Sequence, residues 1–206
     1  MLNYLLAVES PWLQPLVWTD YRLAVIFALM IPLVILIWAF VQKAEAIQRL
    51  MMTYLRVASL LIISLYLMIA ALPISFLTYI MARVLIPISL WFWVDLNEEV
   101  SEMPASGLKL IFTSWRWAVT VYNILGAIVL IPFVHCAFSH GQKELIGDAT
   151  CRIWLDPAWL YKQTFSPNLT PQFLGFFALV GLAVYILYLG YFVFFKLGKQ
   201  GRSAMG

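Results

Sequence analysis

Arg83 and Asn123 are polar residues that lie inside apolar stretches of this 206-residue chain. An arginine in a membrane-spanning helix raises the free energy of insertion by about 2.5 to 3.5 kcal/mol and normally faces protein or a water-filled cavity. Arg83 could therefore bind an anionic group, or it could bridge helices and hold a bundle together. Asn123 is expected to hydrogen bond to a neighbouring helix, an interaction worth about 1 kcal/mol.

A second group of reactive side chains consists of His135, Cys136 and Cys151. The two cysteines are fifteen positions apart. On the non-cytoplasmic side of a membrane they could form a disulfide. Closing a loop of this length would raise the free energy of unfolding by about 3 kcal/mol. His135 could ligate the magnesium of a chlorophyll or a haem iron. The chain has two histidines and no carboxylate pair beside them, so no metal centre is predicted.

Four carboxylates form the acidic cluster of the chain. They are spaced at i, i+3, i+4 and i+7, so a helix would carry all of them on one face: Asp95, Glu98, Glu99 and Glu102. They could bind a hard cation or contact a basic partner. A solvated face is the favoured interpretation of the spacing itself, since a dedicated cation site also needs a fixed turn and neutral oxygen ligands. If the chain docks on a larger complex, this face is expected to contact a loop of the partner.

The sequence lacks the motifs of the common enzyme classes. It contains no G-x-S-x-G, no H-E-x-x-H, no glycine-rich phosphate loop and no C-x-x-C. Intramembrane hydrolases and transferases also usually carry several ionisable residues within the bilayer. The chain is therefore predicted not to be an enzyme.

The composition defines the elements that must position these residues. Hydrophobic residues make up 64% of the chain and charged residues 11%, with a mean hydropathy of +0.90. A soluble domain has about 25% charged residues. The prediction is an all-α polytopic helix bundle in the lipid bilayer, a single membrane domain over residues 1–206. The net charge of +3 is small, and the basic residues lie near helix ends, so no nucleic-acid partner is expected.

Five apolar segments are long enough to be spans. They are predicted at residues 23–41, 55–72, 76–94, 118–138 and 173–195, with an extramembrane loop at 139–172. Residues 1–20 contain prolines and tryptophans and are expected to lie along the interface, without a cleaved targeting peptide and with Asp20 as a helix cap. Pro32 is expected to kink the first span.

The number of spans depends on how residues 50–94 are threaded. One threading has two spans that meet near Pro73. The other has one span followed by a re-entrant or interfacial segment, which gives four spans in total. Five spans place eight basic residues on one side and four on the other, with Arg83 inside the bilayer. The positive-inside rule therefore favours five spans, with the N-terminus lumenal or periplasmic and the C-terminus cytoplasmic.

The last span has two kinds of surface. Gly175, Ala178 and Gly181 provide small residues for close helix contact, and Tyr185 and Tyr188 belong to an aromatic half. The small-residue face and these tyrosines are predicted to bind a partner protein. The aromatic half could also pack on a carotenoid or on lipid tails.

Five stretches of the chain resemble a known family. They are LVWTDYRLAV (16–25), QKAEAIQRL (42–50), LPISFL with IPISLWFWVDLNEE (72–99), FTSWRWAVTVY (112–122) and LGYFVFFKLGKQGRS (189–203). The chain is similar to cyanobacterial integral membrane proteins of about 200 residues that are catalogued as a domain of unknown function. The resemblance implies a photosynthetic bacterium and a thylakoid or plasma membrane, and it brings no catalytic residues.

Two functions follow as expectations. The first is a non-catalytic accessory, assembly or stabilising protein that docks on a larger photosynthetic or other thylakoid complex through its helix faces. The alternative is a small transporter or lipid-handling protein in which Arg83 faces an anionic substrate or headgroup.

Overall fold

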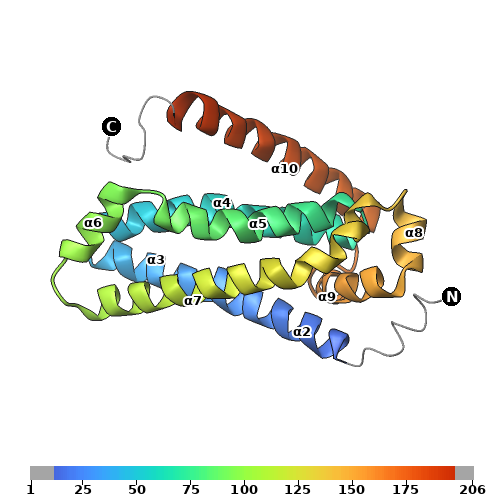
Figure 1. Ribbon diagram of the computed structural model, residues 1–206, viewed down its shortest axis with the longest axis horizontal. Coiled ribbons are helices and arrows are strands. Elements are labelled where there is room, and N and C mark those ends of the chain that lie inside the picture. The colour runs from blue at the N-terminus through green and yellow to red at the C-terminus, as the bar shows by residue number, and fades with distance from the viewer. Residues whose placement is uncertain (1–11, 198–206) are drawn as a thin grey trace.

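The computed structural model describes residues 12–197, and these residues form an all-α polytopic helix bundle (Figure 1). Five helices are long and apolar enough to cross a membrane: Leu13–Val41, Glu45–Ile69, Ile74–Trp91, Gly107–Phe138 and Pro171–Phe195. The predicted fold class is confirmed. The four-span alternative is wrong, because the residues after Arg83 continue the same helix as far as Trp91.

The spans are built from the following elements. The first span joins α2 (Leu13–Ala24), η1 (Val25–Met30) and α3 (Ile31–Val41). The second and third are α4 (Glu45–Ile69) and α5 (Ile74–Trp91), followed by the short α6 (Val94–Glu102). The fourth joins α7 (Gly107–Leu130) to η2 (Ile131–Phe138), and α8 (Gln142–Gly147) and α9 (Ala149–Phe165) follow it. The last span joins α10 (Pro171–Tyr191) to η3 (Phe192–Leu197).

The turn between α4 and α5 makes a tight antiparallel hairpin. Ala71 adopts a left-handed backbone conformation with φ of 49°, and Pro73 follows at the N-cap of α5. Proline has no N–H to donate and clashes with a preceding helical turn, which favours the end of α4 before it. The hairpin places α4 beside α5 along their length.

Pro32 produces a wide helical turn in the first span. The π-helix Val25–Met30 precedes it, and the missing N–H of proline leaves carbonyls without a partner in their own helix. Two side chains from other spans donate to these carbonyls. The Trp115 indole lies 2.9 Å from the Phe27 oxygen, and the Tyr54 hydroxyl lies 2.8 Å from the Ala28 oxygen. The irregular turn is thereby bonded to α7 and α4, as backbone within a membrane requires.

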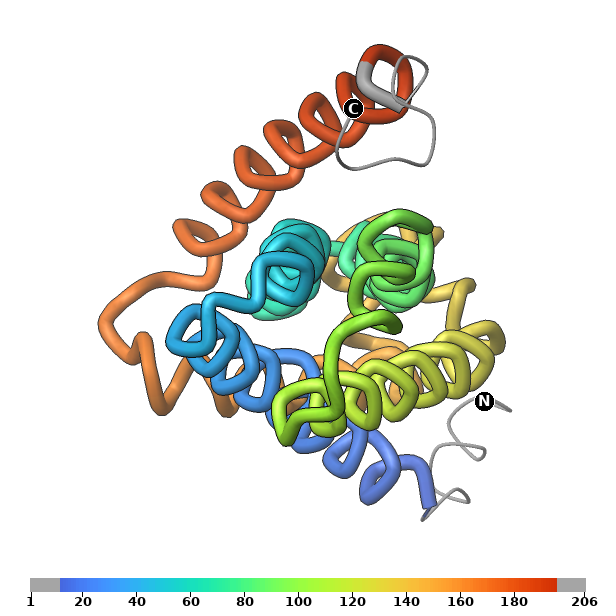
Figure 2. The backbone as a smooth tube through the Cα atoms, turned by 90° about the vertical axis from the view of Figure 1, so that its left-hand side faces the viewer, coloured from blue at the N-terminus to red at the C-terminus, as the bar shows by residue number. Residues whose placement is uncertain are grey.

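Short helices mark the two opposite ends of the bundle. The α6 end holds α6 and the first turns of α4 and α7, whereas the α9 end holds α8, α9 and the α4–α5 turn (Figure 1). Seen along the bundle, α10 stands apart from the other spans (Figure 2). It begins near the α9 end and diverges from α4 and α5 toward its C-terminal half (Figure 1).

Two expectations about helix ends are wrong. Residues 13–20 do not lie along the interface, because they form the beginning of the first span, and Asp20 lies within α2 instead of capping a helix; residues 1–11 lie outside the described part of the chain. The fourth span begins at Gly107, so Trp115 and Arg116 are buried inside it. Arg116 stacks on Trp91, 4.2 Å from the ring centroid, and bonds to Asn97 of α6.

Candidate functional site

Arg83 lies near the middle of α5, and its side chain is only 1% exposed. Its Nη2 atom is 2.6 Å from both carboxylate oxygens of Asp20, which extends from α2. The two residues are 63 positions apart in the sequence. A buried charge is strongly destabilising unless it is paired, and this pair neutralises both partners inside the membrane.

Two tyrosines complete the charged cluster, which we define as Asp20, Tyr79, Arg83 and Tyr122. The Tyr79 hydroxyl donates to Asp20 Oδ2 at 2.8 Å, and the Tyr122 hydroxyl donates to Oδ1 at 2.9 Å. Both hydroxyl oxygens also lie close to Arg83 Nη2, at 2.6 and 3.1 Å. The guanidinium carbon is 4.7 and 4.8 Å from the two ring centroids, within cation–π range. The charged cluster therefore links α2, α5 and α7.

Gly126 of α7 lies directly against the guanidinium. A Cβ atom added at Gly126 would be 1.8 Å from Arg83 Nη1 and 2.6 Å from Cζ. Within the described residues, Nη1 and Nε of Arg83 have no hydrogen-bond acceptor. The absence of a side chain at Gly126 thus allows α7 to approach the charged cluster, and Asp20 and the tyrosines hold the guanidinium in place from the other side.

Substitution of Gly126 by alanine is expected to lower the free energy of unfolding by about 1 to 3 kcal/mol, the range for overpacked interiors. The end of an arginine can usually move, but here any movement breaks the contacts with Asp20. Unfolding of the purified protein in mixed micelles measures the effect.

The control for this substitution is Gly190→Ala, since a Cβ atom there would have nothing within 4 Å. That variant should be as stable as the parent or slightly more stable, because alanine favours a helix over glycine. In an Arg83→Met background the effect of Gly126→Ala should largely disappear. An equal loss in both backgrounds would refute the contact.

A lateral groove reaches one side of the charged cluster. It has a volume of about 190 Å³, lies between α2–η1 and α4, and is bounded at one end by α9. Asp20 and Tyr79 line it, and nearly all its other lining residues are apolar. Arg83 is not among the lining residues, so an occupant of the groove would meet the carboxylate and the phenol and not the guanidinium. This arrangement does not favour Arg83 as a binding group for an anionic substrate.

The cysteines and His135 form a compact cluster at the α9 end. The structure joins Cys136 and Cys151 in a disulfide with a Cα–Cα distance of 5.8 Å. The His135 Nε2 atom lies 3.7 Å from each sulfur and 3.7 Å from Asp148 Oδ2, while Nδ1 faces the Pro132 carbonyl at 2.9 Å. The ring nitrogens are thus turned toward the chain itself, which gives no support to pigment ligation.

Asp148 caps α9 beside this disulfide. Its Oδ1 atom accepts from the backbone N–H groups of Thr150 and Cys151 and from the Thr150 hydroxyl. Partial burial by itself would raise the pKa of Asp148, but the hydrogen bonds and the nearby His135 together lower it. The carboxylate is held in its charged form, which suits a helix N-terminus.

The other predicted site residues lie at different places. Asn123 is buried, and its Nδ2 atom donates to the Val119 carbonyl of its own helix at 2.7 Å. The four acidic residues lie on α6 as predicted, where Glu98, Glu99 and Glu102 are exposed and Asp95 is partly buried. They are at the surface of the α6 end, well separated along α5 from the charged cluster.

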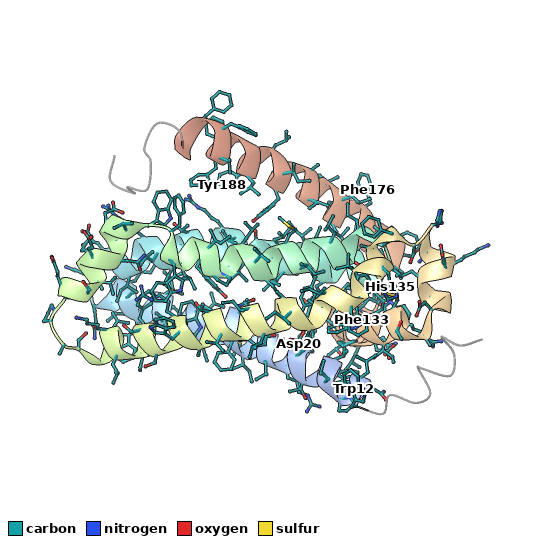
Figure 3. The ribbon with its side chains drawn as sticks, in the orientation of Figure 1. Trp12, Asp20, Phe133, His135, Phe176 and Tyr188 are labelled. Carbon is teal, nitrogen blue, oxygen red and sulfur yellow. A yellow bond between two sulfur atoms is a disulfide. The ribbon has the colours of Figure 1, made fainter. Side chains whose placement is uncertain are left out.

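The small-residue face of α10 packs inside the chain. A Cβ atom at Gly175 would be 2.5 Å from the Ala70 Cβ, and one at Gly181 would be 3.7 Å from Ile63 of α4. Ala178 is buried in the same interface. These residues therefore bring α10 close to α4 instead of facing a partner. Tyr188 lies on the side of α10 toward the bundle, where Arg56 Nη1 donates to its hydroxyl at 3.4 Å (Figure 3).

Sequence reasoning missed most of the charged cluster. It identified Arg83 but not Asp20, Tyr79, Tyr122 or Gly126. The available signal was charge: Asp20 follows directly on an apolar segment, and an intramembrane arginine normally has a partner. Tyrosines and glycines are too common in this chain to be recognised from their positions alone.

The fold and the charged cluster define an α-helical integral membrane protein with five candidate spans, of which the first and third are joined by a buried ion pair. Within that class, residues 14–205 match the family model described as "Protein of unknown function (DUF3177)", and the chain belongs to this family. Neither the curated proteins nor the solved structures include a match to the chain.

Proposed function

We propose that this chain is a non-catalytic accessory, assembly or stabilising protein that docks on a larger membrane complex through the outward face of α10. The observation that carries the proposal is the arrangement of α10. Its small residues pack on α4, so its large apolar side chains point away from the bundle on a helix that diverges from the other spans (Figures 1 and 2).

The outward face of α10 has the spacing of a helix–helix seam. Among its large exposed residues are four at intervals of four and three: Val180, Val184, Leu187 and Tyr191. This is the spacing by which side chains of one helix insert between those of a second helix. These large exposed side chains give a helix of a partner an apolar surface to pack against.

The remaining polar groups are consistent with a protein whose charges serve contacts between helices and with a partner. Inside the bundle, the charges of Arg83 and Asp20 are used for binding one helix to another. At the α6 end, Glu98, Glu99 and Glu102 present an exposed acidic face that complements a basic loop of a partner. The proposed interaction therefore combines an apolar seam within the bilayer with an acidic contact outside it.

The proposed setting is a thylakoid or plasma membrane of a photosynthetic bacterium, as the family resemblance suggests. Two features support a cytoplasmic α6 end and a lumenal or periplasmic α9 end. Basic residues are more numerous in the segments of the α6 end. The disulfide lies at the α9 end, and disulfides persist in oxidising compartments.

The test is a tagged chain expressed at its native level, extracted in mild detergent and separated on a native gel with identification of comigrating proteins. We expect the parent to comigrate with a larger complex at a fixed ratio. Val184→Ala/Leu187→Ala, which trims side chains 61% and 73% exposed, should run alone while keeping its melting temperature.

The matched control trims an equally exposed pair on α3, Val34→Ala/Ile37→Ala, whose side chains are 61% and 64% exposed. This variant should comigrate like the parent. A parent chain that runs alone would contradict the accessory role. Comigration of the α10 variant at the parental ratio would refute the outward face of α10 as the docking surface.

A further inference from the structure

Arg56 differs from Arg83 in having no acidic partner. Both arginines lie within membrane spans, but Arg83 is neutralised by Asp20, whereas no carboxylate pairs with Arg56 in the part of the chain that the structure describes. The Tyr188 hydroxyl, 3.4 Å from Nη1, is a neutral acceptor. An arginine within a span normally pairs with a counter-charge or reaches the interface, and no carboxylate among the described residues supplies that charge for Arg56.

A large cleft lies in front of this arginine. It has a volume of about 570 Å³ and is lined mainly by residues of α4, α5 and the C-terminal half of α10. Figure 1 shows this half of α10 diverging from α4 and α5. Arg49 and Arg56 line its α4 wall, and Tyr185, Tyr188 and Leu189 line the opposite wall. Among the residues that the structure describes, none that lines the cleft is acidic. Most of the others are apolar, including Leu85 and Ile88 of α5.

The two arginines are arranged along the depth of the membrane. They are seven residues apart on α4, and so lie on one face about 10 Å apart along the helix axis. Arg49 is one turn from the start of α4, and its Nη2 atom forms an ion pair with Glu45 Oε2 at 3.6 Å. Arg56 lies farther along α4, away from the α6 end. Arginine side chains in helices point toward the N-terminus, so both guanidinium groups extend toward the α6 surface.

We infer that the cleft binds one anionic phospholipid, with its phosphate between Arg49 and Arg56 and an acyl chain between α10 and α5. The charge of the cleft complements an anionic headgroup, and its apolar depth complements a hydrocarbon tail. The cleft lies between residues of three candidate spans, α4, α5 and α10, which are the elements that a bilayer lipid would contact. This inference does not depend on the proposed docking of α10 on a larger complex.

The test measures binding of palmitoyl-oleoyl phosphatidylglycerol to the purified full chain by native mass spectrometry. The comparison lipid is phosphatidylcholine with the same acyl chains. We expect one phosphatidylglycerol to be retained and phosphatidylcholine to be lost. Arg49→Gln/Arg56→Gln should weaken phosphatidylglycerol binding about thirtyfold, since each basic residue near the surface accounts for about fivefold.

Two further variants separate charge from shape. Lys143→Gln/Arg152→Gln removes two exposed basic residues at the α9 end and should bind phosphatidylglycerol like the parent. Leu189→Trp fills the cleft while leaving both arginines, and should abolish retention of the lipid. Melting temperatures measured without added lipid show whether each variant is folded.

Several outcomes would overturn the inference. Equal retention of phosphatidylcholine would mean that the headgroup is not recognised. Unchanged phosphatidylglycerol binding by Arg49→Gln/Arg56→Gln or by Leu189→Trp would place the lipid elsewhere. A comparable loss in Lys143→Gln/Arg152→Gln would indicate attraction by overall charge. Loss of a copurifying protein instead of a lipid would assign the cleft to a partner helix.

Discussion

Replacing Asp20 by asparagine is expected to lower the free energy of unfolding by about 3 to 5 kcal/mol, because it leaves the Arg83 guanidinium buried without a counter-charge. The guanidinium is 1% exposed and cannot extend to water without dismantling the contacts of α5 with α2 and α7. Arg83→Met should lower it to a similar extent, since Asp20 then loses its cationic partner. Unfolding of the purified protein in mixed micelles provides the measurement.

The double variant Asp20→Asn/Arg83→Met shows whether the two effects share one cause. Removing both charges of a buried pair is often close to neutral, so the double variant should be more stable than either single variant. Arg152→Met, at an exposed arginine on α9, is the control and should change stability by less than about 0.5 kcal/mol. Additive losses in the double variant would show that the two side chains act separately.

Loss of the disulfide should lower the free energy of unfolding by about 3 kcal/mol, the value expected for a crosslink between cysteines fifteen positions apart. The variant is Cys136→Ala/Cys151→Ala, and the same unfolding assay applies. The effect should be concentrated at the α9 end, because the bond ties η2 to the first turn of α9 beside the Asp148 cap. Proteolysis between residues 139 and 172 should accordingly become faster.

Alkylation followed by mass spectrometry provides a direct check of the bond. Denatured protein from the native membrane should take up no alkylating groups before reduction and two after it, since the chain has two cysteines. Cys136 and Cys151 are both fully buried, so the assay must be done on denatured protein. Alkylation of both thiols without a reductant would disprove the crosslink.

The fold was predictable from the sequence because membrane spans depend on local hydropathy. The predicted spans end within three residues of the helices in the structure, but the first, second and fourth helices begin ten or eleven residues before the predicted starts, and the charge distribution correctly favoured five spans over four. The start of the first span was missed. Residues 13–20 contain Pro15, Trp18 and Asp20, a composition typical of an interface, and their place within the bilayer depends on Arg83, far away in the sequence.

The candidate site was less predictable for the same physical reason. Arg83 is conspicuous in its own segment, but its environment is built from α2 and α7, and no local pattern identifies which residues of those helices face it. Gly126 illustrates the limit. Its role is to leave space, which is visible only when the guanidinium of Arg83 is placed beside it.

The separation of Asp20 and Arg83 along the chain also affects biogenesis. Asp20 is synthesised 63 residues before its partner, a delay of about 3 to 13 s at ordinary rates of translation. Tyr122 follows another 39 residues after Arg83. The first span is therefore synthesised before the groups that stabilise its carboxyl group. The charged cluster can be completed only after the fourth span has been made, so the contacts of Asp20 depend on residues that the ribosome has not yet added.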